Sequence, residues 1–139
     1  MTIDAAHQRL IVIREEHSTD GNSVINTLAA VRIADGREVI LDQGYDFYSS
    51  PTISPDGTSL AWLCWRHPNM PWVATHLVVA KFNAAGELSY KQLISGGDTE
   101  SVFQPQWSPD NVLYYVSDRT DYWNLYRSYP VRAGRAPLI

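Results

Sequence analysis

The feature that most constrains this chain is an internal repeat. Residues 48–57 read YSSPTISPDG and residues 102–111 read VFQPQWSPDN, so the same proline and Ser-Pro-Asp pattern recurs 54 residues later. An apolar segment follows each copy, at residues 60–65 and 112–116, and residues 9–14 fit the same slot. A self-similar period of this length is typical of architectures in which each copy is one supersecondary unit.

Each unit continues in the same order after its apolar segment. A second strand-like segment is centred on a leucine, at residues 26–31, 75–80 and 123–127. A turn with glycine and a last short segment then follow, with the glycines at Gly36, Gly86 and Gly134 and the segments ending at Leu41, Ile94 and Ile139. Four strands per unit predict an all-β fold, a partial β-propeller of about three four-stranded antiparallel blades.

We expect one domain over residues 1–139, with blades at 8–44, 48–96 and 102–139. In this assignment the first blade lacks its innermost strand and the last blade is clipped in its outermost strand. A chain of 139 residues suits one hydrophobic core better than two. A helix over residues 24–33 is the alternative for one segment, but the strand assignment keeps all three copies in phase.

The Ser-Pro-Asp-Gly run predicts a tight turn between the first two strands of a blade. Pro55 presets φ for the turn, Asp56 bonds nearby backbone, and Gly57 accepts a positive φ. Asn111 takes the place of Gly57 in the second copy, and asparagine is one of the few residues that tolerate this conformation. Both copies are therefore expected to form the same turn.

Composition and charge exclude several classes of partner. A net charge of −4 and a pI near 5.4 give no excess of basic surface for nucleic acid or a membrane. No apolar run approaches the roughly 20 residues needed to cross a bilayer, and residues 1–9 lack a signal pattern, so we expect a cytoplasmic protein. The single cysteine, Cys64, lies in an apolar segment and is expected to be a buried structural thiol.

Six short segments carry a family resemblance: REEH at 14–17, DFYSSP at 46–51, SPDG at 54–57, HPNMPW at 67–72, ESVFQP at 100–105 and SDRT at 117–120. Together they resemble the propeller of acylaminoacyl-peptidase-like members of the prolyl oligopeptidase family of serine peptidases. The stretches at 67–72 and 100–105 are the most specific, whereas SPDG is shared with TolB-type propellers. Val73 departs from the family pattern, in which an acidic residue follows Pro-Trp.

The resemblance implies a propeller that lies over an α/β-hydrolase domain, which carries a Ser-His-Asp triad and lies mostly C-terminal to the propeller. This chain contains no Gly-x-Ser-x-Gly, and its four histidines have no spacing that indicates a triad or a metal site. We therefore expect a non-catalytic segment without cofactors that gates or selects peptide substrates for a serine peptidase whose catalytic domain is absent from this chain. The alternative is a TolB-type protein-binding propeller with no hydrolase domain.

Strand order places the candidate site on one face. Because neighbouring strands run antiparallel, the loops after the second and fourth strands of each blade lie on the same side. The candidate substrate-binding residues there are Glu100, Arg66, Trp72 and Arg119. Glu100 would pair with the amino group of a peptide or, in the alternative, with Arg119 or Arg66 across a blade boundary. Trp72 would face a peptide or pack between blades.

Three partners are expected. The resemblance implies the α/β-hydrolase domain of the parent protein and a peptide substrate. The isolated chain is also expected to self-associate, because an incomplete ring exposes apolar flanks and strand edges at both ends.

Overall fold

The computed structural model describes residues 1–130, and all regular structure in that range is β-strand. The strands are β1 (Thr2–Asp4), β2 (Arg9–His17), β3 (Val24–Arg32), β4 (Glu38–Asp42), β5 (Phe47–Ile53), β6 (Ser59–Trp65), β7 (His76–Phe82), β8 (Leu88–Gly96), β9 (Val102–Trp107), β10 (Leu113–Ser117) and β11 (Asn124–Ser128). Within this range there is no helix of the length and hydrophobicity needed to cross a membrane.

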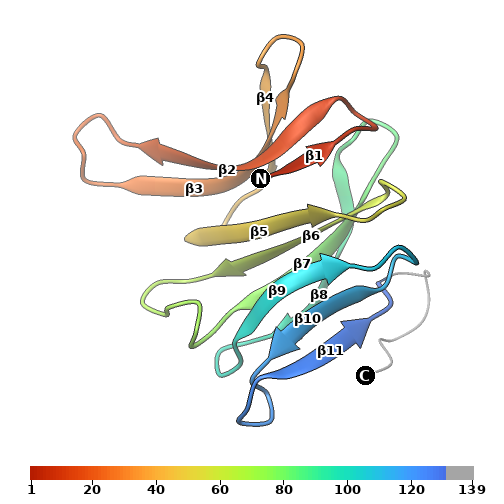
Figure 1. Ribbon diagram of the computed structural model, residues 1–139. Helices are drawn as coiled ribbons and strands as arrows, with labels where there is room; N and C mark the ends of the chain where they lie inside the picture. Colours follow the sequence, from red (N-terminus) through yellow and green to blue (C-terminus); the bar gives the residue numbers. More distant parts are fainter. Residues whose placement is uncertain (131–139) are drawn as a thin grey trace.

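The strands form three antiparallel sheets that follow one another along the molecule (Figure 1). Their orders are β1-β2-β3-β4, β5-β6-β7-β8 and β9-β10-β11, so consecutive strands are always neighbours. The first strand of the second sheet, β5, contacts both β1 and β9, which makes these three strands the inner edge of an arc. The predicted partial propeller is confirmed, and the segment with the helical alternative is strand β3.

The first blade has an innermost strand, contrary to the prediction. β1 pairs with β2 through Thr2 and Ile11, Ile3 and Leu10, and Asp4 and Arg9. This blade therefore begins at Thr2 and not at residue 8. β1 is only three residues long and is followed by a turn without the Ser-Pro-Asp-Gly pattern, so the repeat does not mark it. The clipped outermost strand predicted for the last blade falls outside the described residues.

The repeated turns have the predicted backbone conformation. Gly57 has a φ of 73° and Asn111 a φ of 59°. The amide of each donates to the carbonyl oxygen of the serine three residues earlier, at 2.8 Å for Gly57 and 3.0 Å for Asn111. The two turns also touch each other, because the amide of Asp56 donates to the side-chain oxygen of Asn111 at 3.2 Å. The repeat thus encodes both the turn and a contact between blades.

The inner strands carry a second repeated feature. Ser50 and Gln104, which precede Pro51 and Pro105, have φ values of 53° and 52°, and the pairing of β5 with β6 shifts register at this point. Such bulges are expected where a proline interrupts the ladder. Trp107 then joins the two inner strands, since its indole nitrogen donates to the carbonyl oxygen of Thr52 at 3.2 Å.

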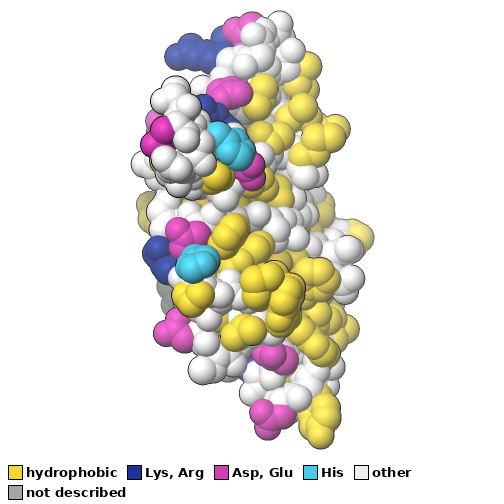
Figure 2. Space-filling model, turned by 90° about the vertical axis from the view of Figure 1, so that its left-hand side faces the viewer, with side chains coloured by type: hydrophobic (Ala, Val, Ile, Leu, Met, Phe, Trp, Pro, Cys, Tyr) yellow, Lys and Arg dark blue, Asp and Glu magenta, His cyan; other side chains and the backbone are white. Residues whose placement is uncertain are grey.

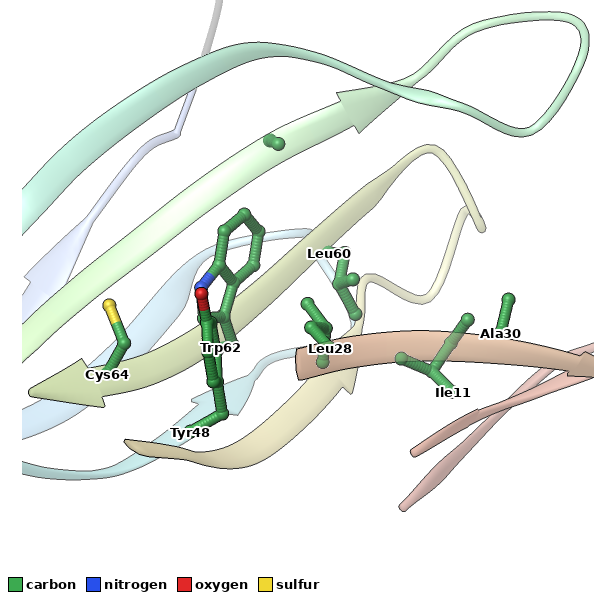
Figure 3. Packing of buried hydrophobic residues seen from close by; sticks show 8 residues of the cluster. Ile11, Leu28, Ala30, Tyr48, Leu60, Trp62 and Cys64 are labelled. Carbon is green, nitrogen blue, oxygen red and sulfur yellow. The ribbon is translucent and has the colours of Figure 1, made fainter. Parts of the chain in front are cut away.

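The central strand β6 supplies both hydrophobic layers. Leu60, Trp62 and Cys64 pack toward the first blade, with Ile11 and Leu28 among their partners (Figure 3). The alternating positions pack toward the third blade, in a cluster that holds Ala61, Leu63, Leu77, Val79, Ile94, Val102, Leu113 and Tyr115. Because both faces of β6 are covered, its sequence is apolar at nearly every position.

Cys64 is a buried structural thiol, as predicted. Its side chain is 0% exposed and forms no disulfide. Burial is the main cause that raises the pKa of this thiol to about 12. The reactive thiolate is therefore scarce at neutral pH.

Candidate functional site

The candidate site lies on the side of the molecule where the loops after β2, β6 and β10 project. Figure 2 views this side and shows hydrophobic side chains gathered in its lower half, beside acidic groups and a histidine. The loop between β6 and β7 contributes three exposed apolar residues, Met70, Trp72 and Val73, with Trp72 at 63% exposure. An exposed apolar patch beside charged side chains is typical of an interaction surface.

Glu100 lies between the second and third blades and pairs with Arg119. Its Oε1 atom accepts hydrogen bonds from the hydroxyls of Ser95 at 2.7 Å and Ser117 at 2.6 Å. The Nε of Arg119 donates to the same oxygen at 3.1 Å, and the guanidinium also donates to the Ser95 hydroxyl. The guanidinium carbon lies 4.7 Å from the centre of the Tyr126 ring. The cluster therefore ties the ends of β8 and β10 to the start of β9.

The charged form of Glu100 is favoured by its surroundings. Burial is the largest influence and raises the pKa of this carboxyl, but the hydrogen bonds from Ser117 and Ser95 and the charge of Arg119 together outweigh it. The net pKa lies below its ordinary value. The carboxylate thus stays ionised at neutral pH while its Oε1 is occupied by groups of the chain itself.

The loop that carries Trp72 is fixed to this cluster. The carbonyl oxygen of Pro71 accepts hydrogen bonds from the hydroxyls of Thr75 and, at 2.6 Å, Ser101. The amide of Thr75 donates to the carbonyl oxygen of Glu100 at 3.0 Å. The amide of Ser101 donates to Asp118 at 2.7 Å. Trp72 is therefore an exposed aromatic side chain on a backbone held at several points.

Arg66 belongs to a different blade junction. Its guanidinium carbon lies 4.3 Å from the centre of the Tyr45 ring, and its Nη1 donates to the carbonyl oxygen of Gly44 at 2.7 Å. It thus anchors the loop between the first and second blades. The fold brings Glu100 and Arg119 into direct contact, whereas Arg66 is engaged with Tyr45 and Gly44.

Ser95 and Ser117 were not anticipated as partners of Glu100. Both are buried serines at the ends of strands, and a lone serine gives no signal in a single sequence. Only the close approach of β8 and β10 identifies them. Over residues 1–130, no group of three or more His, Cys, Asp or Glu side chains is placed to hold a metal ion.

No protein-family model matches the chain, and no curated protein matches it. Among solved structures, a Mycobacterium tuberculosis puromycin-hydrolyzing peptidase matches with a TM-score of 0.85 and 29% identity over 99% of this chain. A puromycin hydrolase matches with a TM-score of 0.83 and 33% identity over 96% of this chain. The chain is a partial propeller of the prolyl oligopeptidase family.

This prolyl oligopeptidase-family propeller spans only a small part of those proteins. It covers 22% of the M. tuberculosis peptidase and 21% of the puromycin hydrolase. TolB from Acinetobacter baumannii also matches, with a TM-score of 0.59 and 13% identity over 94% of this chain. At that identity the likeness to TolB concerns the propeller fold alone.

Proposed function

We propose that this chain is the non-catalytic propeller segment that gates or selects peptide substrates for a serine peptidase, whose α/β-hydrolase domain lies outside it. The observation that carries the proposal is the 33% identity to a puromycin hydrolase over 96% of the chain. The chain also lacks a Gly-x-Ser-x-Gly nucleophile motif. Its contribution to the parent protein would then be selection of the substrate and not the chemistry.

The substrate class follows from the same comparison. The matched proteins are described as hydrolysing puromycin, so we propose peptides and related aminoacyl compounds as substrates of the parent protein. The hydrolase domain and the peptide are its proposed partners, in the cytoplasm, where a protein with a single free cysteine keeps its thiol reduced.

Trp72 is the residue that we propose contacts the peptide most directly. Its side chain is 63% exposed, and exposed aromatic rings supply large contact area at a small entropic cost. Glu100 and Arg119 support this contact by fixing the loop through Thr75. Arg66 orients the neighbouring loop through Gly44. Glu100 and Arg119 thus act as positioning residues beside the proposed contact.

The test uses the parent protein, read from the frame past Ile139. Further blades followed by a Gly-x-Ser-x-Gly motif support the proposal, and the purified parent is expected to hydrolyse puromycin. Trp72→Ala should lower kcat/KM by about tenfold, as loss of one aromatic contact predicts. Tyr90→Ala is the control, since Tyr90 is an exposed aromatic residue on β8, the outermost strand of the second blade, and it should leave kcat/KM unchanged.

A TolB-type binding propeller is the second candidate, favoured by the shared fold at a TM-score of 0.59. A reading frame that ends after propeller repeats, without a nucleophile motif, would support it and overturn the peptidase proposal. Equal losses of kcat/KM in the Trp72→Ala and Tyr90→Ala variants would overturn the role of Trp72 alone.

A further inference from the structure

A pocket lies at the junction of the first two blades, on the side of the molecule away from Trp72. Its volume is about 270 Å³. Its walls come from the turns between β1 and β2, between β3 and β4, and between β7 and β8, together with the adjoining parts of β2, β3 and β4. The polar lining residues are His7, Arg9, Arg32 and Arg37, and the apolar ones are Ala30, Val39 and Ala85.

The lining of this pocket is positively charged, whereas the chain as a whole is negatively charged. Arg9 is paired with Asp4 at 2.7 Å, and Arg32 is paired with Asp35. The guanidinium of Arg37 has no side-chain partner among residues 1–130. Three guanidinium groups thus share two carboxylates, in a chain whose net charge is −4. The lining keeps a positive excess that an anion would neutralise.

The cationic wall is built on a buried anchor. The Asp4 side chain is 1% exposed and accepts hydrogen bonds from Arg9 at 2.7 Å and from the His7 ring at 2.8 Å. Arg9 also donates to the carbonyl oxygen of Gly86, which fixes the turn that carries Ala85. His7, Arg9 and the turn that carries Ala85 are therefore positioned before any ligand arrives, which lowers the cost of binding.

We propose that this pocket binds the phosphate group of a small organic phosphate. Guanidinium groups from separate parts of the blade, at the start of β2, the end of β3 and the turn after it, suit a tetrahedral group with several acceptor oxygens. The volume exceeds what one phosphate needs, and Ala30, Val39 and Ala85 offer an apolar surface for the organic part. This site is independent of the peptide-binding face, so either proposal stands if the other fails.

The test is an NMR titration of the full 139-residue chain with phenyl phosphate and, separately, with inorganic phosphate. Phenyl phosphate should shift the amide signals of Ala85 and Gly86 saturably and bind about tenfold more tightly than inorganic phosphate, because its ring buries apolar surface. Equal affinity would instead assign the site to free phosphate. Absence of a saturable shift with both probes would overturn the proposal.

Two turn variants provide a matched comparison. Ala85→Asp places a carboxylate against the pocket and should weaken phenyl phosphate binding by about tenfold or more through like-charge repulsion. Ala84→Asp adds the same charge at the neighbouring exposed position, which does not line the pocket, and should weaken binding much less. Arg37→Gln should also weaken binding, whereas Arg127→Gln on β11 should not. Equal effects within either pair would overturn the proposal.

Discussion

The carbonyl oxygen of Gly86 accepts a hydrogen bond from the guanidinium of Arg9, 77 residues earlier in the chain. Gly86 has a φ of 78°, and a Cβ atom at this position would lie 2.9 Å from the ring of His7 and 3.0 Å from Arg9. The turn between β7 and β8 thus sits directly on the turn between β1 and β2. The first and second blades are thus joined through two turns that carry no recognisable sequence motif.

Gly86→Ala should therefore destabilise the fold by about 2–3 kcal/mol, since it combines positive-φ strain with a clash between blades. Gly21→Ala is the matched control, because Gly21 has a φ of 71° with nothing within 4 Å of an added Cβ. It should cost only about 1 kcal/mol, the strain alone. Denaturant unfolding of both variants measures the difference, and equal costs would show that the contact with His7 and Arg9 contributes nothing.

The Ser-Pro-Asp turn makes a different prediction. Gly57 has a φ of 73°, and its added Cβ would meet only Ala6 at 3.8 Å, an ordinary contact. Gly57→Val should destabilise by about 1–2 kcal/mol from backbone strain, whereas Gly57→Asn should be tolerated. Asn111 already holds the equivalent position at a φ of 59°. Similar melting temperatures for the two variants would argue against strain as the cause.

The pKa of Glu100 predicts a pH dependence of stability. Its folded pKa lies below the ordinary value of 4.5, so the ionised carboxylate stabilises the fold above pH 4.5. That contribution is lost as the pH falls through the lower folded value. We expect the free energy of unfolding to decrease as the pH falls below about 4.5.

Glu100→Gln should reduce that decrease and should also destabilise the protein at neutral pH, because Arg119 and two serines lose a charged acceptor. Glu87→Gln is the control, since Glu87 is exposed in a turn and its replacement should change the free energy of unfolding at neutral pH by less than about 0.5 kcal/mol. An identical pH profile in wild type and Glu100→Gln would contradict the assignment.

Self-association of the isolated chain stays a prediction, with its surface now defined. Ile3 and Ile40 alternate with the positions that face the second blade, and they are 64% and 48% exposed. On the third blade Leu125 is 69% exposed. Such flanks favour pairing with a second copy.

Light scattering at about 50 µM should give a mass above that of the 15.7 kDa chain. The double variant Ile3→Lys, Ile40→Lys should lower the measured mass. Val73→Lys should not, because Val73 lies in the loop between β6 and β7 and not on the flank of the first blade. A monomeric mass together with a sharp two-state thermal unfolding transition would contradict the prediction, because it would show that the three blades are stable without a second copy.

The repeat in the sequence was sufficient to predict the blades and their turns. Turns are local: Pro55, Asp56 and Gly57 define their own conformation, and Asn111 preserves it. The apolar run in β6 likewise indicated a strand covered on both faces, which Trp62 and Leu63 confirm by packing into opposite layers. Each of these features depends on residues close together in the chain.

Features that depend on distant residues were decided only by the tertiary structure. β1 was not predicted, because a strand of three residues is too short to show an apolar pattern. It forms a strand because its backbone pairs with the edge of β2. Glu100 was a candidate from its place in the sequence, and one of its two predicted partners, Arg119, proved right. Ser95, Ser117 and the junction of Arg9 with Gly86 had no signal, because each depends on strands from different parts of the chain meeting in space. A periodic sequence determines its own turns and strands, but the contacts between blades depend on packing that no local segment encodes.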